Sequence, residues 1–169
     1  MNENKIEIQE FNYPLLFRII FRYGNIIITG LLLVYSLPLL SALNKNKFLI
    51  IPLLITLMVI YFLNRHYLAL YKILPFKIEV DDAKIICSHY FFSKKEVIIY
   101  YKDINFLTGA IFENKISGIM MVCDGKNNIR IGFYRRLKNS NKLATILLSK
   151  VKKELYDEIM EKLIQKKRI

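Results

Sequence analysis

The chain has 169 residues, of which 54% are hydrophobic and 24% are charged, and its formal net charge is +12 at pH 7. An apolar share this high exceeds that of an ordinary soluble domain, so the composition argues against a wholly soluble protein and points to membrane segments. With only two cysteines, the sequence excludes a disulfide-rich secreted scaffold and suits a reducing compartment.

The N-terminal segment, residues 1–22, has a polar part and an amphipathic part. Residues 1–12, MNENKIEIQEFN, alternate weakly and are compatible with either a short strand or a flexible lead. Residues 13–22, YPLLFRIIFR, combine aromatic side chains with arginines, which settle at the headgroup level of a membrane. We therefore expect the second part to lie at the membrane interface.

Residues 23–72 predict a hairpin of two membrane-spanning helices. Two uncharged runs, residues 26–43 and 48–63, correspond to helices about 27 and 24 Å long, close to a hydrocarbon core of about 30 Å. Each run is apolar all round, unlike a surface helix of a soluble domain, and the first run lacks the position and cleavage pattern of a signal peptide. Only NKNK, residues 44–47, separates the runs, which requires the helices to be antiparallel.

Hydroxyl side chains occur within the two runs, whereas charged side chains do not. A proton or ion pathway would need intramembrane charges, so none is suggested. The hydroxyls have no acidic, basic or metal-binding neighbour, and we expect them to bond to the backbone of their own helices. The residues concerned are Ser36, Ser41 and Thr56.

The hairpin places both chain ends on one side of the membrane, and the flanking bases indicate which side. Cytoplasmic flanks of membrane helices are enriched in Lys and Arg. The chain-end side carries Arg18, Arg22, Arg65 and Lys72, whereas the turn carries Lys45 and Lys47. This difference predicts a multi-pass protein of the cytoplasmic membrane with both termini in the cytoplasm.

After Pro75, which breaks the preceding helix, the hydrophobic pattern changes to the alternation of strands. Six short runs are separated by polar turns, most of them compatible with hairpins. We expect an antiparallel meander that curls to bury one face. The runs are FKIEV, IICSHYFF, EVIIYY, INFLTGAIF, IMMVC and IRIGF.

The C-terminal part returns to helical spacing, which predicts one amphipathic helix that begins near Asn139 or Ser140. The sequence thus predicts an α-helical membrane hairpin followed by a mainly-β soluble domain, residues 73–169, that the helix closes. The apolar positions of the helix lie four apart, at Leu143, Leu147, Val151, Leu155, Ile159 and Leu163.

This layout resembles that of the bacterial pleckstrin-homology-like (bPH) membrane proteins. The likeness is carried by ILPFKIEVDDAKI, EVIIYYKDINFL, DGKNNIRIGF and the helix from Ser140. The resemblance implies a PH-like bent antiparallel sheet or open barrel, capped at one end by the C-terminal helix, that acts as a binding or scaffold module. The first hairpin turn, DDAK, carries two acids where lipid-binding relatives place several bases, which argues against phosphoinositide recognition through this loop.

The sequence offers no catalytic, cofactor-binding or metal-binding constellation. Cys87 and His89 lie two apart on a predicted strand and would face the same way, but a structural zinc site needs four ligands and only Cys123 adds a sulfur. We expect unconnected core or surface residues. His66 lies where the chain leaves the membrane, and we expect it to be an interfacial polar residue.

Asp103 lies in YYKDINFLTG without a catalytic companion. An Asp side chain accepts backbone N–H bonds in turns, and in the resembling family a similar Asp-Ile step occurs where one strand gives way to the next. We therefore expect Asp103 to be a structural turn residue whose replacement by Ala weakens folding.

A basic stretch, RIGFYRRLKNSNK, joins the last strand to the helix and is the candidate site for lipid phosphate or an acidic partner. The alternative is a solvated turn. Residues 73–169 carry 19 Lys and Arg against 11 Asp and Glu. Proximity to an anionic leaflet explains this excess, and no nucleic-acid motif accompanies it. The basic turn comprises Arg135, Arg136, Lys138 and Lys142.

These observations predict a non-enzymatic, membrane-anchored protein that acts as an accessory, scaffold or interaction subunit of a membrane complex. Its expected partners are the bilayer and either a membrane protein or a second copy of the chain. The alternative is binding or sensing of anionic lipid. We expect no cofactor and no nucleic acid.

Overall fold

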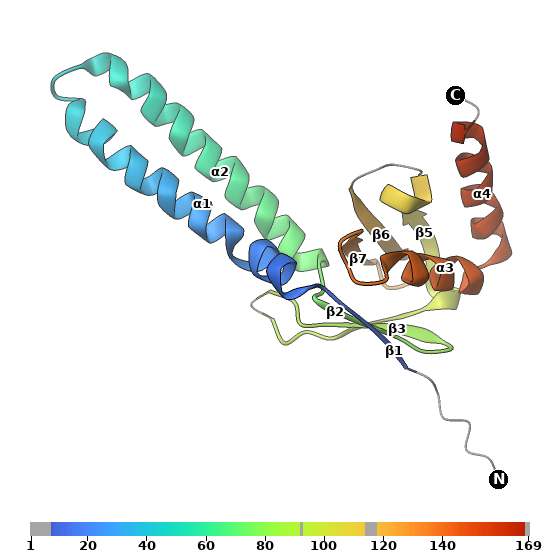
Figure 1. Cartoon of the computed structure of the whole chain (residues 1–169). Coiled ribbons are helices and arrows are strands. Elements are labelled where there is room, and N and C mark those ends of the chain that lie inside the picture. Colours follow the sequence, from blue (N-terminus) through green and yellow to red (C-terminus); the bar gives the residue numbers. More distant parts are fainter. Residues whose placement is uncertain (1–7, 92, 114–117, 168–169) are drawn as a thin grey trace, which may run out of the picture. The chain divides into compact units, whose positions relative to one another are not determined.

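The computed structural model describes residues 8–91, 93–113 and 118–167 (Figure 1). The chain forms two compact units. Leu15–Lys72 forms one, here called the helical unit, and Met1–Pro14 together with Ile73–Ile169 forms the other, here called the sheet unit. The sheet unit therefore combines a segment that precedes the helical unit in the sequence with one that follows it.

The helical unit is an antiparallel hairpin, as predicted. Helices α1 (Leu15–Ala42) and α2 (Ile50–Ile73) run side by side, and a single 3-10 turn, η1 (Lys47–Leu49), leads into α2 (Figure 1). Both helices are long and apolar enough to cross a membrane, and most of their large apolar side chains are exposed. A helix in a soluble core would bury such side chains, so the hairpin has the surface that lipid-facing helices need.

Polar side chains join the two helices of the hairpin. The Asn25 amide donates to Asn64 Oδ1 at 2.9 Å, and the Asn64 amide donates to Thr29 Oγ1 at 3.0 Å. The Tyr71 hydroxyl donates to the carbonyl of Arg22 at 3.3 Å. Because an apolar environment offers few competing partners, these bonds fix how the helices are aligned.

The three hydroxyls expected to bond to the backbone of their own helices do so, which confirms the prediction, whereas the Thr29 hydroxyl accepts the Asn64 amide. Each donates to a carbonyl three or four residues earlier in the chain. The donors are Ser36, Ser41 and Thr56, and the acceptors are the carbonyls of Leu33, Leu37 and Pro52, at 2.7, 3.1 and 2.8 Å.

In its described residues, the sheet unit contains two antiparallel sheets rather than one continuous meander. All six predicted strands are present, and a further strand, β1, precedes the hairpin. The four-stranded sheet has the order β1-β2-β3-β4 and the three-stranded sheet the order β5-β6-β7. The strands are β1 (Gln9–Asn12), β2 (Lys77–Val80), β3 (Lys84–Ser88), β4 (Val97–Tyr100), β5 (Ile104–Thr108), β6 (Ile119–Asp124) and β7 (Ile129–Tyr134).

Strand β1 lies before the hairpin in sequence and pairs with β2, which follows it. The register joins Gln9 to Val80 and Asn12 to Lys77. Phe11 is buried in the sheet unit at 2% exposure, and this burial favours a strand over a flexible lead for the polar segment around it. Residues 1–7 of the predicted lead lie outside the described part of the chain.

The expected division into 1–22, 23–72 and 73–169 therefore differs from the structure on its N-terminal side. Residues 9–12 belong to the sheet unit, and helix α1 already begins at Leu15. The segment YPLLFRIIFR contains no helix breaker after its proline, so the expected interfacial residues continue directly into the apolar run as one helix.

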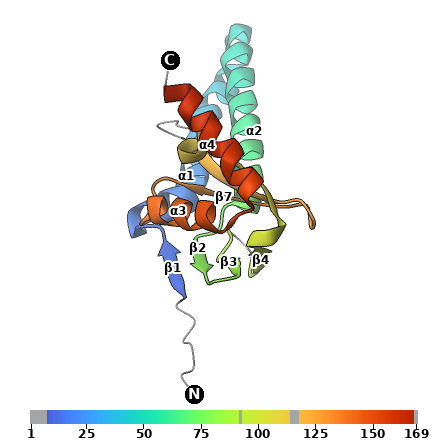
Figure 2. The ribbon, with the colours of Figure 1, turned by 90° about the vertical axis from the view of Figure 1, so that its right-hand side faces the viewer.

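The C-terminal stripe forms two helices, α3 (Ser140–Lys150) and α4 (Lys153–Lys167), where one was predicted. Val151 between them is extended, with φ −76° and ψ 166°, and the chain changes direction there (Figure 2). Helix α3 contacts the 3-10 turns η2 (Tyr101–Asp103) and η3 (Ala110–Glu113), whereas α4 contacts η3 and β5. The break lets the two halves of one apolar stripe cover different parts of the sheet unit.

The core of the sheet unit is formed by both sheets together with buried side chains of α3 and α4. Alternate residues of each strand point inward, as the period of a half-buried strand requires. Tyr13, which follows β1, packs edge-on against Phe76 with 6.0 Å between ring centroids. The largest fully buried side chains of this unit include Ile78, Ile85, Ile99, Met120, Ile131, Phe133, Leu143, Leu147 and Ile159.

Candidate functional site

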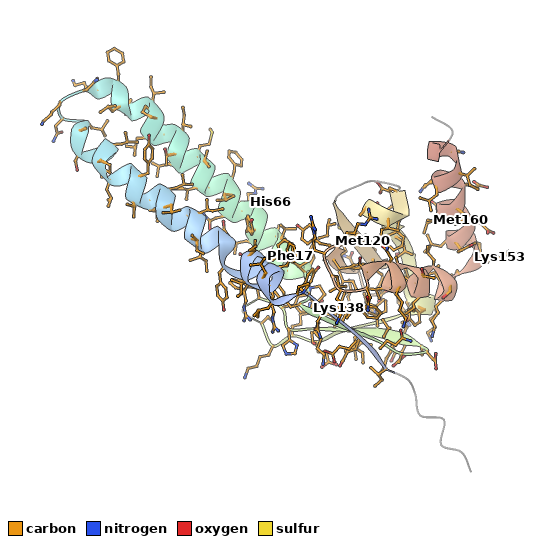
Figure 3. The ribbon with its side chains drawn as sticks, viewed as in Figure 1. Phe17, His66, Met120, Lys138, Lys153 and Met160 are labelled. Carbon is orange, nitrogen blue, oxygen red and sulfur yellow. The ribbon has the colours of Figure 1, made fainter. Side chains whose placement is uncertain are left out.

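The basic turn lies between β7 and α3, and all four of its cationic residues are exposed. The Ser140 hydroxyl donates to the carbonyl of Arg135 at 2.8 Å, and the Lys138 N–H donates to the carbonyl of Asn12 at 3.0 Å. Lys138 lies beside the start of α3 in Figure 3. The turn is thus fixed at its backbone, while its cationic side chains face solvent.

Strand β1 also holds the end of β7. The Tyr134 N–H donates to the hydroxyl of Tyr13 at 2.8 Å. Burial raises the pKa of the Tyr13 hydroxyl above its ordinary value of 10.0, so this phenol stays neutral. The segment before the hairpin therefore anchors the strand that leads into the basic turn.

Asp103 ends the 3-10 turn η2, which connects β4 of the first sheet to β5 of the second. Among the described residues, its hydrogen bond is made by the main chain: its carbonyl accepts the N–H of Gly125 at 3.2 Å. The position at a strand junction agrees with the sequence, whereas the expected bonds to its carboxylate do not occur in this part of the chain.

Two other aspartates make the bonds that were expected of Asp103. Asp81 Oδ1 accepts the N–H groups of Ala83 and Lys84, at 2.7 and 2.8 Å, in the turn between β2 and β3. Asp124 does the same between β6 and β7, where its Oδ1 accepts the N–H groups of Lys126 and Asn127, at 2.8 and 3.1 Å.

The cysteines and histidines do not converge. Strand β3 ends at Ser88, because His89 adopts a left-handed φ of 59°. Cys87 is therefore buried while His89 is exposed, so the expectation that they face the same way is wrong. Within residues 8–91, 93–113 and 118–167, no group of three potential metal ligands occurs. Burial raises the pKa of the Cys87 thiol above 9.0.

The remaining histidine, His66, lies on α2, where Figure 3 labels it, and it is exposed. Its ring packs edge-on against that of Tyr67, with 6.2 Å between centroids. It belongs to the helical unit and lies in the last three turns of a helix long enough to cross a membrane, near the membrane exit predicted from the sequence.

A feature that the sequence did not predict is a shallow cleft of about 640 Å³ on the sheet unit, here called the lysine cleft. Its walls come from the β2–β3 turn, from the junction of β4 with η2, and from the end of α3. Because three separate stretches of the chain line the cleft, no local sequence pattern predicts it. The lining residues are Asp82, Ala83, Tyr100, Tyr101, Lys102, Lys150, Val151 and Lys152.

Lys150 is held in place within this cleft. Its Nζ donates to Asp82 Oδ1 at 2.8 Å and to the carbonyl of Asp81 at 3.3 Å, and it lies 5.4 Å from the centroid of the Tyr101 ring. The Tyr101 hydroxyl donates to the same Asp81 carbonyl. Burial, followed by the nearby carboxylates of Asp81 and Asp82, raises the pKa of Tyr101 to about 12.

Strand β4 forms the outer edge of the four-stranded sheet. Its side chains alternate, with Val97 and Ile99 buried and with Ile98 and Tyr100 exposed. Ile98 lies opposite Ile86 of β3. Within the described part of the chain, the second side of β4 pairs with no strand, and the second side of β1, at the other edge of this sheet, pairs with none either.

Comparison with known proteins gives no relative: no family model matches the chain, and neither the curated proteins nor the solved structures contain a match. The site must therefore be interpreted from its own chemistry.

Proposed function

We propose that this protein is a membrane-anchored, PH-like interaction module that acts as an accessory or scaffold subunit of a membrane complex. Two apolar helices supply the anchor. The described part of the chain has seven antiparallel strands, in sheets of four and three, followed by C-terminal helices. This arrangement supports the PH-like bent sheet or open barrel inferred by resemblance.

The open edge of β4 carries this proposal. Ile98 and Tyr100 are exposed on the edge strand at 39% and 44%. An edge strand with exposed apolar side chains invites pairing with another strand, and soluble proteins normally protect such edges with charges or prolines. We infer that a membrane protein partner or a second copy of the chain covers it.

The proposed role is non-enzymatic. Among the described residues no three potential metal ligands come together, and Asp103 uses its main chain rather than its carboxylate. These positions leave the titratable groups that the sequence singled out without the mutual geometry that acid–base or nucleophilic catalysis needs.

The proposed location is the cytoplasmic membrane, with both chain ends and the sheet unit on the cytoplasmic side. Pairing of β1 with β2 requires that both ends of the hairpin emerge on the same side. The excess of Lys and Arg at that end of the hairpin favours the cytoplasm.

The full chain purified in a mild detergent tests the proposal. We expect its mass by light scattering to correspond to a homo-oligomer or to a stoichiometric complex, and we expect Ile98→Lys to reduce it to that of a monomer. Tyr156→Lys, at a side chain of similar exposure (38% against 39%) on α4, is the matched control and should leave the complex intact. A monomer in every detergent, or equal loss with both variants, contradicts the proposal.

A second candidate function is binding of anionic lipid through the basic turn. The observation that favours it is that all four cations of the turn are exposed on a fixed backbone. Native mass spectrometry of the full chain should then count fewer retained anionic lipids after charge reversal of Arg135, Arg136, Lys138 and Lys142. Reversal at the exposed Lys94 and Lys95, outside the turn, is the control. Equal lipid counts in all three proteins eliminate this function.

A further inference from the structure

The lysine cleft has the composition of an anion site. Three of its lining residues are lysines, Lys102, Lys150 and Lys152, and one, Asp82, is an acid. The other two clefts described on the sheet unit each pair a single base with a single acid. The lysine cleft therefore has more cationic residues than either of these two clefts.

Two of the three lysines of the cleft lie over aromatic rings. Lys150 lies over Tyr101 at 5.4 Å, and Lys102 lies over Tyr100 at 5.7 Å from the ring centroid. A ring face attracts an ammonium group and restricts its side chain. Since less side-chain freedom remains to be lost, binding of an anion to these groups costs less entropy than binding to free surface lysines.

The carboxylate of Asp82 is paired with Lys150, where a bound anion would otherwise lie. Its carboxylate lies 2.8 Å from Lys150 Nζ, yet its side chain is 88% exposed, whereas that of Lys150 is only 29% exposed. An exposed ion pair is weak, because water screens it. Asp82 can therefore swing away when a stronger anion arrives.

The other two lysines have no such partner. Among the described residues, neither Lys102 nor Lys152 forms an ion pair, and both are exposed. Asp82 thus offsets only one of the three positive charges. A phosphate group carries more charge than a carboxylate and has more acceptor oxygens, so it can engage several ammonium groups together.

We propose that the lysine cleft binds a phosphate-bearing anion, which displaces Asp82 from Lys150 and is held by Lys102, Lys150 and Lys152. This site is separate from the basic turn, and it shares Tyr100 with the β4 edge. The phosphate group is the shared chemistry of two sources, a soluble phosphate compound and a lipid headgroup, which the experiment distinguishes.

The test uses the full chain in a neutral detergent, with inorganic pyrophosphate titrated by calorimetry at low ionic strength. A parallel titration uses phosphatidic acid in mixed micelles. We expect Lys102→Gln combined with Lys152→Gln to weaken binding about tenfold or more. Asp82→Asn should tighten binding, because it removes the competing carboxylate. Lys94→Gln combined with Lys95→Gln removes the same charge elsewhere and should leave the affinity unchanged.

Each result has a defined consequence. Binding of pyrophosphate identifies a soluble phosphate compound as a sufficient ligand, and binding of phosphatidic acid alone identifies a lipid headgroup. Binding of neither probe overturns the proposal, as does equal weakening in the cleft and control variants. Unchanged or weaker binding in Asp82→Asn overturns the displacement of Asp82. The substituted lysines are exposed, so unchanged thermal unfolding of the variants verifies that only the site has changed.

Discussion

The carboxylate of Asp124 accepts the hydrogen bonds that hold the turn between β6 and β7. It is 2% exposed, and besides two backbone N–H groups it accepts the Asn127 side-chain amide on Oδ2 at 2.8 Å. A buried carboxylate with three donors is costly to remove, because the donors lose their acceptor together.

We expect Asp124→Ala to destabilise the sheet unit by about 1–3 kcal/mol. Asp103→Ala, at a carboxylate without such donors among the described residues, should stay within about 0.5 kcal/mol. This reassigns to Asp124 the folding role expected of Asp103 from the sequence. The midpoint of thermal unfolding of the full chain in detergent measures both, and a larger loss for Asp103→Ala would refute the reassignment.

The same carboxylate makes stability depend on pH. Burial alone would raise the pKa of Asp124, but the hydrogen bonds from Asn127 and Lys126 outweigh it and hold the pKa below 3.8. A folded-state pKa below the unfolded value means that the contribution is present above about pH 4 and is lost as the pH falls through the lowered value.

We therefore expect the difference in unfolding midpoint between the native chain and Asp124→Asn to shrink as the pH is lowered from 6 to 3. The Asn variant has no proton to gain at this position, so it serves as the reference. A difference that stays constant over this range would show that the ionised form of Asp124 contributes nothing.

Turn chemistry could be predicted from the sequence, but its assignment to one aspartate could not. Asp81, Asp103 and Asp124 all follow apolar runs, and each is a plausible acceptor for the next backbone N–H groups. Which one bonds depends on the path of the backbone. At η2 the chain passes from one sheet to the other, and the carbonyl of Asp103 is directed at Gly125 instead.

At the scale of elements, the stability of the sheet unit depends on β1, which is separated in sequence from the other strands by the hairpin. It supplies Phe11, and the residue after it supplies Tyr13; both are buried at no more than 5% exposure. Removing one buried aromatic side chain costs about 3–5 kcal/mol. A fragment that starts after the hairpin lacks both rings and leaves β2 as a bare edge.

We expect a soluble fragment of residues 73–167 to lack a cooperative thermal transition, whereas residues 8–14 joined to it through a flexible linker restore one. Circular dichroism during heating measures this. Phe11→Ala in the joined fragment is the control, because it keeps the strand and removes one ring. If the fragment without β1 unfolds at the same temperature as the joined one, β1 is dispensable.

The alternation of apolar residues located six strands, and continuous apolar runs located the two helices of the hairpin, since both patterns are local. The sequence left β1 open between a strand and a flexible lead, because its four residues, QEFN, contain one apolar side chain. Its partner strand, β2, follows the hairpin in the sequence. The break at Val151 has no Gly or Pro to mark it, because it is set by what α3 and α4 cover. The lysine cleft could not be predicted either, because three separate stretches of the chain line it.

At the scale of the whole molecule, the proposed orientation can be tested with single cysteines. In a Cys123→Ser background, with Cys87 fully buried, we expect Asn46→Cys in the hairpin turn to react with a membrane-impermeant maleimide added to intact cells. Lys94→Cys in the sheet unit should react only after lysis. The reverse pattern would invert the orientation, and reaction of both in intact cells would rule out a hairpin that crosses the membrane.

Pairing of β1 with β2 also has a consequence for biosynthesis. The ribosome delivers Phe11 first, but the partner strand appears only after both helices of the hairpin have been made. Until then β1 has no ladder to join, and the domain cannot close its core. If the hairpin crosses the membrane as proposed, failure of the second helix to insert would leave β1 and β2 on opposite sides of the membrane. With that topology, the sheet unit can complete its fold only after both helices have been inserted, and an incomplete sheet would expose the chain to proteolysis.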